Sequence, residues 1–510
     1  MEAFGRATCA SRFAARENAL RTVAALLAAA CLTTLGGRAH ATCSLWTQTR
    51  CDAENSASIV LDAPKSGPAR AWTFDGSERV WGYEPGVTIW SSPALGVVGK
   101  RAVVAVGSYD HTLYALDAAT GETLWKFTTG GPIFAAPVFW EADGKPWIFV
   151  ASNDRTAYAI DADQGRPLWV HAVEDYRATL GGSRLGAPSI GRVGATTDAL
   201  FVSYWVWDGS LAHNEAHAAV VALSARDGKP IWRQPLGDNE LTATVFAQSG
   251  GHNYVLVGSS NGNVYSLDAD TGRVLWTQTE LDSVRSPPAV AQTEVGPLVV
   301  MASKYGAVRG LSIDTGSERW RFKTGDRITG SPAVLGSGRG ARVFVGSYDR
   351  ALYCLDAATG RKIFDHALRG GIYSSAALVP NAGRPMVLES AWDNQLHAIG
   401  ASDGASIFSI FTGRPIWNVA GLDESNWSSP SAALVNGRWM AYVGSYDGAL
   451  RALPLEDDAR IIPRLRSNLG FWLSFPIALT PLALLARALT LRARRQEAED
   501  SSSAPHHAQS

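Results

Sequence analysis

The chain has little cysteine and almost no net charge. Five cysteines and four methionines are spread over 510 residues, and the formal net charge at neutral pH is −1. No long basic run occurs outside the neighbourhood of one C-terminal apolar stretch, so the sequence lacks the positive surface with which nucleic-acid-binding proteins contact phosphates. We therefore expect no nucleic-acid partner.

The N-terminal segment has the pattern of a secretory signal peptide. Four arginines precede an apolar run over residues 22–35, and the small-residue pattern Ala39-His40-Ala41 follows. This order predicts that residues 1–41 are a signal peptide cleaved after Ala41. Processing at Cys31, as in a lipoprotein, is the alternative, although Ala28 stands where such signals usually carry a bulky aliphatic residue. Export predicts a periplasmic location in a bacterial cell.

Export leaves three cysteines in the mature chain, Cys43, Cys51 and Cys354. Exported proteins keep disulfides, so Cys43 and Cys51 are predicted to close a small loop in an N-terminal segment over residues 42–69. Cys354 stands among apolar neighbours in an expected strand. It is predicted to be a buried free thiol without a catalytic role.

A second long apolar stretch lies near the C-terminus. Residues 469–486 carry no charge over eighteen positions, close to the length that crosses a bilayer. This predicts one transmembrane helix in the bacterial inner membrane, with a linker over residues 456–468 before it and a cytoplasmic tail over residues 487–510 after it, where several arginines follow directly. The membrane is thus an expected partner of the chain.

Between these two segments the sequence repeats itself. Residues 105–110, Ala-Val-Gly-Ser-Tyr-Asp, are nearly copied at residues 344–349. Each copy shows short runs of alternating apolar residues between turns, which predicts four antiparallel strands per repeat. Spacings of about 40 to 50 residues are typical of propellers and solenoids.

A glycine precedes an aromatic residue by four positions in six of the repeats, as in Gly121 and Trp125. Glycine supplies the positive φ of a tight hairpin, and the aromatic ring on the outer strand is expected to pack against the next repeat. Most of these aromatics stand twelve residues before the next strand start; by this spacing the docking residues are Trp81, Trp125, Trp169, Trp232, Trp276, Trp320, Phe364 and Trp417. The spacing selects Trp417 over Phe408 and predicts an insertion in the hairpin before it.

The strand starts give the number of repeats. They fall at Pro93, Pro137, Pro188, Thr244, Pro288, Pro332, Ala376 and Pro430. The last repeat lacks its own outer strand, and a strand around Trp81 is expected to complete it and so to remove the open sheet edges. The sequence therefore predicts an all-β, eight-bladed β-propeller of four-stranded antiparallel blades over residues 70–455.

The repeat also carries a family resemblance. The pattern Ala-x-Asp-x-x-Thr-Gly-x-x-x-Trp, seen as Ala115, Asp117, Thr120, Gly121 and Trp125, resembles the tryptophan-docking repeat of pyrroloquinoline-quinone-type, quinoprotein alcohol dehydrogenase-like propellers. The resemblance covers residues 70–455 and implies the fold. It leaves the activity open, because the family includes dehydrogenases that hold the quinone and assembly scaffolds that hold none. The vicinal cysteine pair and the Cys-x-x-Cys-His haem motif typical of such enzymes are both missing here.

Three other patterns are interpreted as structural. Gly258-Ser-Ser-Asn-Gly262 matches the hydrolase nucleophile motif but aligns with strand-to-strand turns, whereas that motif requires a strand-to-helix turn. His213, Glu215 and His217 share one face of a possible strand without a fourth ligand, so no metal site is predicted. A recurring turn aspartate is expected to stabilise its own turn; it occurs as Asp110, Asp154, Asp349, Asp393 and Asp447.

The strongest functional signal is positional. The residues three before the strand starts mark one end of the central channel, here called the mouth; they are Trp90, Phe134, Leu185, Leu241, Arg285, Thr329, Tyr373 and Trp427. Trp90 and Trp427 fall on neighbouring blades and are predicted to form a stacking surface for a planar ligand or a peptide, with Arg285 available to an anion. A plug of the channel is the alternative interpretation of these aromatics.

These features favour a non-catalytic, membrane-anchored binding or assembly scaffold with a periplasmic protein partner. The alternative is a quinone-dependent dehydrogenase, in which Trp90, Arg285 and Trp427 would contact pyrroloquinoline quinone, with calcium as a second cofactor. The third strand of the last blade is expected to end on the face opposite the mouth, and thirteen linker residues follow it. The mouth is therefore predicted to face away from the membrane, with enlarged loops at residues 169–188 and 204–217.

Overall fold

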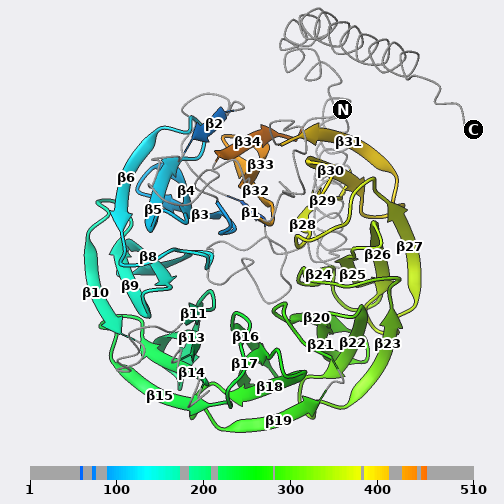
Figure 1. Cartoon of the computed structure of the whole chain (residues 1–510), viewed down its shortest axis with the longest axis horizontal. Helices are drawn as coiled ribbons and strands as arrows, with labels where there is room; N and C mark the ends of the chain where they lie inside the picture. Colours follow the sequence, from blue (N-terminus) through cyan, green and yellow to red (C-terminus); the bar gives the residue numbers. More distant parts are fainter. Residues whose placement is uncertain are drawn as a thin grey trace, which may run out of the picture. The chain divides into compact units, whose positions relative to one another are not determined.

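The computed structural model describes residues 58–60, 72–75, 89–172, 183–207, 216–279, 282–380, 384–412, 428–444 and 449–455. Their strands form eight sheets arranged as blades around a central axis, which confirms the predicted eight-bladed propeller (Figure 1). Within this part of the chain, no helix is long and apolar enough to cross a membrane. The predicted signal peptide, the Cys43 and Cys51 pair and the predicted span over residues 469–486 lie outside the described residues.

The first four blades follow one another along the chain. Blade 1 consists of β3 (Ala94–Val98), β4 (Arg101–Gly107), β5 (Thr112–Asp117) and β6 (Thr123–Thr128). Blade 2 consists of β7 (Val138–Ala142), β8 (Lys145–Ser152), β9 (Thr156–Asp161) and β10 (Pro167–Ala172). Blade 3 consists of β11 (Ser183–Leu185), β12 (Ser189–Val193), β13 (Thr197–Trp207), β14 (Ala216–Ser224) and β15 (Pro230–Pro235). Blade 4 consists of β16 (Val245–Ser249), β17 (His252–Gly258), β18 (Asn263–Asp268) and β19 (Val274–Thr279).

The last four blades complete the ring. Blade 5 consists of β20 (Ala289–Thr293), β21 (Gly296–Ala302), β22 (Ala307–Ser312) and β23 (Glu318–Lys323). Blade 6 consists of β24 (Ala333–Leu335), β25 (Arg342–Gly346), β26 (Ala351–Asp356) and β27 (Lys362–Ala367). Blade 7 consists of β28 (Ala377–Val379), β29 (Met386–Ala391), β30 (Gln395–Gly400) and β31 (Ser406–Phe411). Blade 8 combines β32 (Ser431–Val435), β33 (Arg438–Gly444) and β34 (Ala449–Pro454) with β1 (Ser58–Val60) and β2 (Trp72–Asp75).

The predicted strand starts are correct in all eight blades. Each inner strand begins one residue after the predicted position, from β3 at Ala94 to β32 at Ser431. The cause is local: proline, or a small residue in its place, ends the connection between blades and permits an extended chain. Blade 3 adds β11, which pairs with the far end of β13 beside β12.

A small residue stands opposite the docking aromatic in every blade. Ala115 pairs with Trp125 across β5 and β6, and this register recurs around the ring. The other pairs are Ala159 with Trp169, Ala222 with Trp232, Ser266 with Trp276, Gly310 with Trp320, Cys354 with Phe364, Ala398 with Phe408 and Ala452 with Trp72. A large ring fits there because its cross-strand neighbour is small.

The described docking tryptophans join each blade to the next. Trp125 Nε1 donates a hydrogen bond to the carbonyl of Ala162 at 2.8 Å, and Trp169, Trp232, Trp276 and Trp320 make the equivalent bond. The ring also covers a hairpin glycine of the next blade. Gly165 has φ of +69°, and a Cβ there would lie 2.6 Å from the Trp125 ring. Glycine is therefore required both by the turn and by the close approach of the ring.

The structure corrects the docking position of blade 7. The outer strand β31 carries Phe408 in the docking register, so the assignment of this position to Trp417 is wrong. The β30 to β31 hairpin has the usual length, and the extra residues follow β31 instead. Trp417 itself lies outside the described residues. The error arose because the spacing to the next strand start varies with the length of the connection between blades.

The ring closes through both ends of the propeller. The N-terminal strand β2 pairs antiparallel with β34, as expected for a split last blade, but Trp72 rather than Trp81 takes the docking register. Trp81 lies outside the described residues. Side chains of blade 8 add bonds to blade 1: Ser431 Oγ donates to the carbonyl of Pro93 at 2.7 Å, and the buried Tyr442 hydroxyl donates to the carbonyl of Ala118 at 2.8 Å.

Blade 8 has a fifth strand that the sequence did not predict. The segment β1 pairs parallel with β32 on its axis side, with Ser58, Ile59 and Val60 opposite Ala432, Ala433 and Leu434 (Figure 1). It also contacts β28 of blade 7. An isolated three-residue strand gains few backbone hydrogen bonds, each worth about 1 kcal/mol net. Because ordering the chain costs about 1–2 kcal/mol per residue, pairing over three residues adds little net stability.

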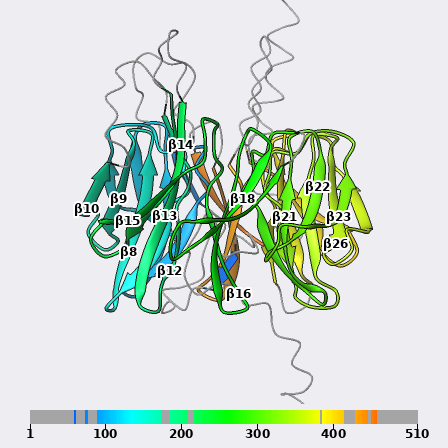
Figure 2. The same ribbon diagram turned by 90° about the horizontal axis from the view of Figure 1, so that it is seen from below.

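The strand directions define two faces of the propeller. The blade-to-blade connections and the turns between second and third strands share the mouth face, because each inner strand runs away from it and the next strand returns. The paired part of β13 and β14 extends to Trp207 opposite Ala216 and rises above the neighbouring blades at that face (Figure 2). Since β34 is a third strand, it ends on the opposite face, as expected.

Candidate functional site at the mouth of the propeller

Aromatic side chains gather at the mouth beside blades 1 and 2. Trp90 and Phe134, each just before an inner strand, stack with their ring centroids 5.1 Å apart and an interplanar angle of 24°. Tyr109, from the β4 to β5 turn, meets Trp90 edge-on at 6.1 Å and Phe134 at 5.6 Å. All three rings are partly exposed. We call Trp90, Tyr109 and Phe134 the first aromatic cluster.

A second aromatic cluster lies at the mouth beside blades 6 and 7. Tyr348 packs edge-on against Trp392 at 4.9 Å and lies 5.9 Å from Tyr373. The Arg327 guanidinium stands 4.4 Å from the centre of the Tyr348 ring, a cation–π contact. Arg327 is exposed, whereas the three rings are partly buried. This arrangement presents flat apolar faces next to a cation.

Charged groups occupy the opposite part of the mouth. Arg184 of blade 3 and Glu240 before blade 4 form a 2.6 Å ion pair, and Arg285 precedes the inner strand of blade 5. Their fields reach across the channel: burial raises the pKa of Tyr373, and the positive charges of Arg184 and Arg285 partly offset this rise. Charged side chains of blades 3 to 5 thus lie on the same face of the propeller as the two aromatic clusters.

The structure describes two of the three predicted site residues. Trp90 stacks on Phe134 of the following blade, and Arg285 belongs to blade 5, across the ring from blade 1 (Figure 1). Trp427 lies outside the described residues. The role of these three residues in ligand binding stays a prediction. Tyr109, Tyr348 and Trp392 were not among the predicted site residues, because each precedes a turn aspartate that was interpreted as structural. The signal that could have identified them is an aromatic residue that recurs at one turn position.

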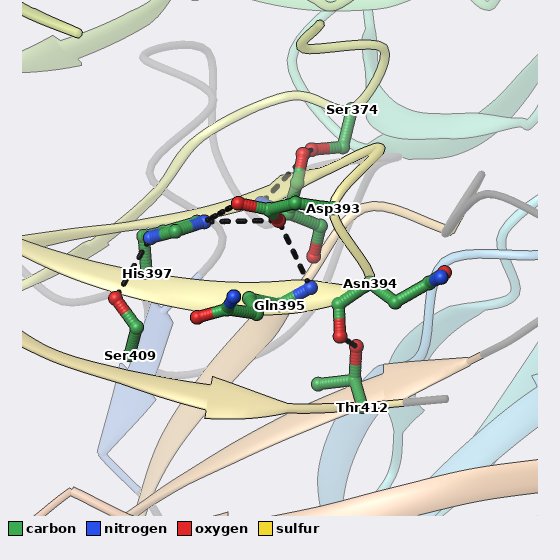
Figure 3. Close-up of polar contacts among 8 residues, drawn as sticks. Ser374, Asp393, Asn394, Gln395, His397, Ser409 and Thr412 are labelled. Atoms are coloured by element: carbon green, nitrogen blue, oxygen red, sulfur yellow. Dashed lines mark hydrogen bonds and ion pairs between the residues drawn. The ribbon is translucent and has the colours of Figure 1, made fainter. Parts of the chain in front are cut away.

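Blade 7 carries a polar group that departs from the repeat. His397 Nε2 lies 3.1 and 3.0 Å from the two carboxylate oxygens of Asp393, and His397 Nδ1 lies 2.8 Å from Ser409 Oγ (Figure 3). Because a carboxylate only accepts, Nε2 carries the proton in the neutral ring, and Nδ1 accepts the Ser409 hydroxyl hydrogen. The order serine, histidine, carboxylate matches that of a catalytic triad.

The repeat explains this group without catalysis. Tyr114, Tyr158 and Tyr353 occupy the same strand position and donate to their own turn aspartates at 2.6 to 2.7 Å. Each of these aspartates also accepts a backbone N–H two residues later, as Asp393 accepts that of Gln395. His397 thus substitutes for tyrosine in a turn clasp, and Ser409 lies exposed on the outer strand. This supports the structural interpretation of the turn aspartates.

A buried carboxyl group distinguishes the same blade. Glu389 is fully buried where the equivalent strand positions of blades 1 and 6 hold Val106 and Val345. The Ser374 hydroxyl donates to Glu389 Oε1, and Ser374 Oγ accepts the N–H of Ser390 at 3.2 Å. Gly346 of blade 6 lies beside this carboxyl group, and a Cβ there would lie 2.2 Å from the Ile372 side chain and 3.4 Å from Glu389 Oε2. Hydrogen bonding of this kind is what a buried carboxyl group requires.

The remaining sequence candidates have structural positions. Gly258 to Gly262 form the turn between β17 and β18, as expected. Burial raises the pKa of Cys354 to about 12, so its thiol is protonated and unreactive at neutral pH. His217 lies at the start of β14, whereas His213 and Glu215 fall outside the described residues. Among described residues, no three acidic, histidine or cysteine side chains are grouped to hold a metal ion.

Comparison with known proteins identifies the family. The family model described as "Outer membrane protein assembly factor BamB", one of the PQQ-type repeat families, matches residues 60–201, 216–331 and 304–459. The chain belongs to this family. The matched segments include all eight blades, in agreement with the resemblance found in the docking repeat. No curated protein sequence matches the chain significantly.

Solved structures of two dehydrogenases and of a designed protein share the fold of this family member. The quinohemoprotein alcohol dehydrogenase of Comamonas testosteroni has a TM-score of 0.56 at 14% identity and covers 81% of this chain and 80% of its own. A europium-containing methanol dehydrogenase gives 0.56 at 14% identity, over 79% of this chain and 91% of its own. The computationally designed Ika8 protein gives 0.52 at 16% identity, over 72% of this chain and 96% of its own. These similarities concern the fold alone.

Proposed function

We propose that this protein is a membrane-anchored scaffold in the bacterial periplasm, and that its mouth face binds a protein partner without catalysing a reaction. The observation that carries the proposal is the pair of aromatic clusters at the mouth, with Arg327 over the Tyr348 ring. Partly exposed aromatic rings next to arginine are the side chains that dominate protein interfaces. The family description, an outer membrane protein assembly factor, supports the same role.

The residues predicted to contact pyrroloquinoline quinone are only partly grouped in the described structure. Phe134 covers one face of Trp90, and Arg285 lies across the ring from it. Cys354 is buried and protonated, so it cannot substitute for a reactive cysteine pair beside a quinone. Both points favour the scaffold over the dehydrogenase.

Photo-crosslinking in cells tests the partner site. A photoreactive phenylalanine analogue at Tyr348 should give one defined adduct with an envelope protein, whereas the analogue at Val295, exposed on the opposite face, should give none. Arg327→Glu should abolish the Tyr348 adduct because it removes the cation above that ring. Equal adducts from both positions, or an adduct indifferent to Arg327→Glu, would rule out a specific mouth partner.

A quinone titration tests the alternative function, a quinone-dependent dehydrogenase. The full chain in detergent, given pyrroloquinoline quinone and calcium, should show no saturable change in quinone absorbance and no alcohol-dependent dye reduction. Stoichiometric uptake accompanied by dye reduction would replace the scaffold with the dehydrogenase.

We further propose that the mouth faces away from the membrane. The direction of β34 supports this, since it ends on the opposite face just before the linker to the predicted span. Tyr305 in a mouth turn and Val295 in an opposite turn are 61% and 62% exposed, so cysteines there form a matched pair. In spheroplasts, a membrane-impermeant maleimide should label Tyr305→Cys quickly and Val295→Cys slowly, with equal rates after detergent extraction. Faster labelling of Val295→Cys in spheroplasts would reverse the orientation.

A further inference from the structure

Blade 8 differs from the other blades at its axis-side edge. In the described residues, β3, β7, β16, β20, β24 and β28 end their sheets at the axis, whereas β32 pairs with the parallel strand β1. The partner strand precedes the propeller in sequence and is separated from β2 by residues 61–71. The chain therefore places a segment of its own in a position that the repeat does not provide.

The inner strand of blade 8 is also the one with the smallest side chain at a key position. Ala432 is the second residue of β32. The equivalent residues of the other seven blades are Leu95, Phe139, Ile190, Phe246, Val290, Val334 and Leu378. Ala432 is fully buried, and its side chain is the smallest of the eight at this position.

The direction of this position is known from the other blades. Phe139 points at the preceding blade, where a Cβ on Gly96 would lie 2.4 Å from its ring, and Phe246 meets Gly191 in the same way. Ala432 accordingly faces blade 7 and its inner strand β28. The strand β1 contacts both β32 and β28. The small side chain of Ala432 and the extra strand β1 thus both lie at the axis side of the junction between blades 7 and 8.

We propose that the axis-side edge of β32 is a strand-addition site, which residues 58–60 occupy in the resting protein and which an extended segment of a partner polypeptide occupies in their place. Recognition would run through the main chain, with the added strand parallel to β32. In the part of the chain that the structure describes, the resting occupant pairs with three of the five residues of β32, so a partner strand that pairs with all five can displace it. The partner's identity rests on the proposed scaffold function; the site itself does not.

A reversible crosslink tests the exchange without deleting any segment. Val60 and Leu434 are register partners, so Val60→Cys with Leu434→Cys should form a disulfide that holds β1 in place, in a background where Cys43 and Cys51 are serine. The probe is a fluorescein-labelled synthetic peptide of residues 55–63. Fluorescence anisotropy of the full chain should show binding at least about tenfold tighter after reduction than in the oxidised protein, because the bound state of β1 competes with the peptide.

Two further variants locate the site. Deletion of residues 42–66, which keeps β2, should strengthen peptide binding relative to the parent. In that background, Ala432→Leu should abolish binding by restoring the bulk that other blades carry, whereas Val334→Leu at the equivalent position of blade 6 should leave it unchanged. Leucine occurs naturally at this position in blades 1 and 7, so the variant is expected to fold; its thermal transition is the check.

Equal peptide affinity in the oxidised and reduced crosslink variant would overturn the proposal, as would undiminished binding to Ala432→Leu. The outcome is independent of the mouth site. A photo-crosslink from Tyr348 without peptide binding to β32 would contradict only the strand-addition site. Peptide binding without a Tyr348 crosslink would contradict only the partner proposed for the mouth.

Discussion

Replacing residues 72–75 with a Gly-Ser-Gly-Ser segment is expected to destabilise the whole propeller. The strand β2 supplies the outer strand of blade 8, and its pairing with β34 joins the two ends of the ring. Four residues of lost pairing and a newly exposed sheet edge should cost about 4 kcal/mol or more. We expect the melting temperature to fall by roughly 5–10 °C, measured by circular dichroism on the full chain.

A matched variant separates closure from the rest of the N-terminal segment. Deletion of residues 42–66 removes β1 but leaves β2, so its melting temperature should stay near that of the parent. A disulfide between Thr73→Cys and Arg451→Cys, which are register partners, should have the opposite effect and raise stability by about 4 kcal/mol, because it closes a very long loop. Parental melting of the 72–75 replacement would mean that β2 does not close the ring.

Much of the fold could be predicted because the repeat is regular and its cues are local. Prolines before the inner strands and glycines in the outer hairpins act within a few residues, so the strand starts at Ala94 to Ser431 follow from them. The sequence also predicted that an N-terminal strand completes the last blade, because a closed ring cannot leave one blade short of its outer strand.

The two wrong docking residues were assigned from spacing along the chain, whereas the docking position is set by pairing across strands. Trp417 and Trp81 were chosen by their spacing to the next strand, which changes with loop length. The structure selects Phe408 and Trp72 by the small residues opposite them, Ala398 and Ala452. The strand β1 had no sequence signal, because three residues show no periodicity and their partner is more than three hundred and fifty positions away.

The candidate site could be predicted only in part for a related reason. Trp90 and Arg285 were found because they occupy one position of the repeat. The contacts that make a surface join different positions, such as Tyr109 to Trp90 and Tyr348 to Tyr373. Glu389 was visible only as a break in the Val-Gly-Ser-Tyr-Asp pattern, and Ser374, which donates to its carboxyl group, lies in the connection between blades 6 and 7. Contacts between blades join residues far apart in the sequence, so no single segment of the sequence predicts them.

The docking tryptophans should contribute strongly to stability, and Trp320 offers the sharpest test. Its side chain is 6% exposed, lies over Gly360 of the next blade, and donates from Nε1 to the carbonyl of Ala357 at 2.9 Å. Trp320→Ala should therefore cost about 3–5 kcal/mol. Trp320→Phe should cost only about 1–2 kcal/mol, since it loses the hydrogen bond but keeps most of the ring, as Phe364 does naturally in blade 6.

Two more variants make the test specific to docking. Gly360→Ala should be destabilising by about 2 kcal/mol, because φ is +69° and the added methyl group would lie about 2.4 Å from the Trp320 ring. Trp205→Ala is the control: Trp205 is partly exposed on the tall hairpin of blade 3 and donates to the carbonyl of Asp238 at 3.0 Å, so its loss should cost less than about 1.5 kcal/mol. Urea unfolding followed by tryptophan fluorescence and circular dichroism gives the four midpoints. The expected order of stability is Trp205→Ala, Trp320→Phe, Gly360→Ala, Trp320→Ala, and a Trp320→Ala midpoint equal to that of Trp205→Ala would show that docking between blades does not hold the ring together.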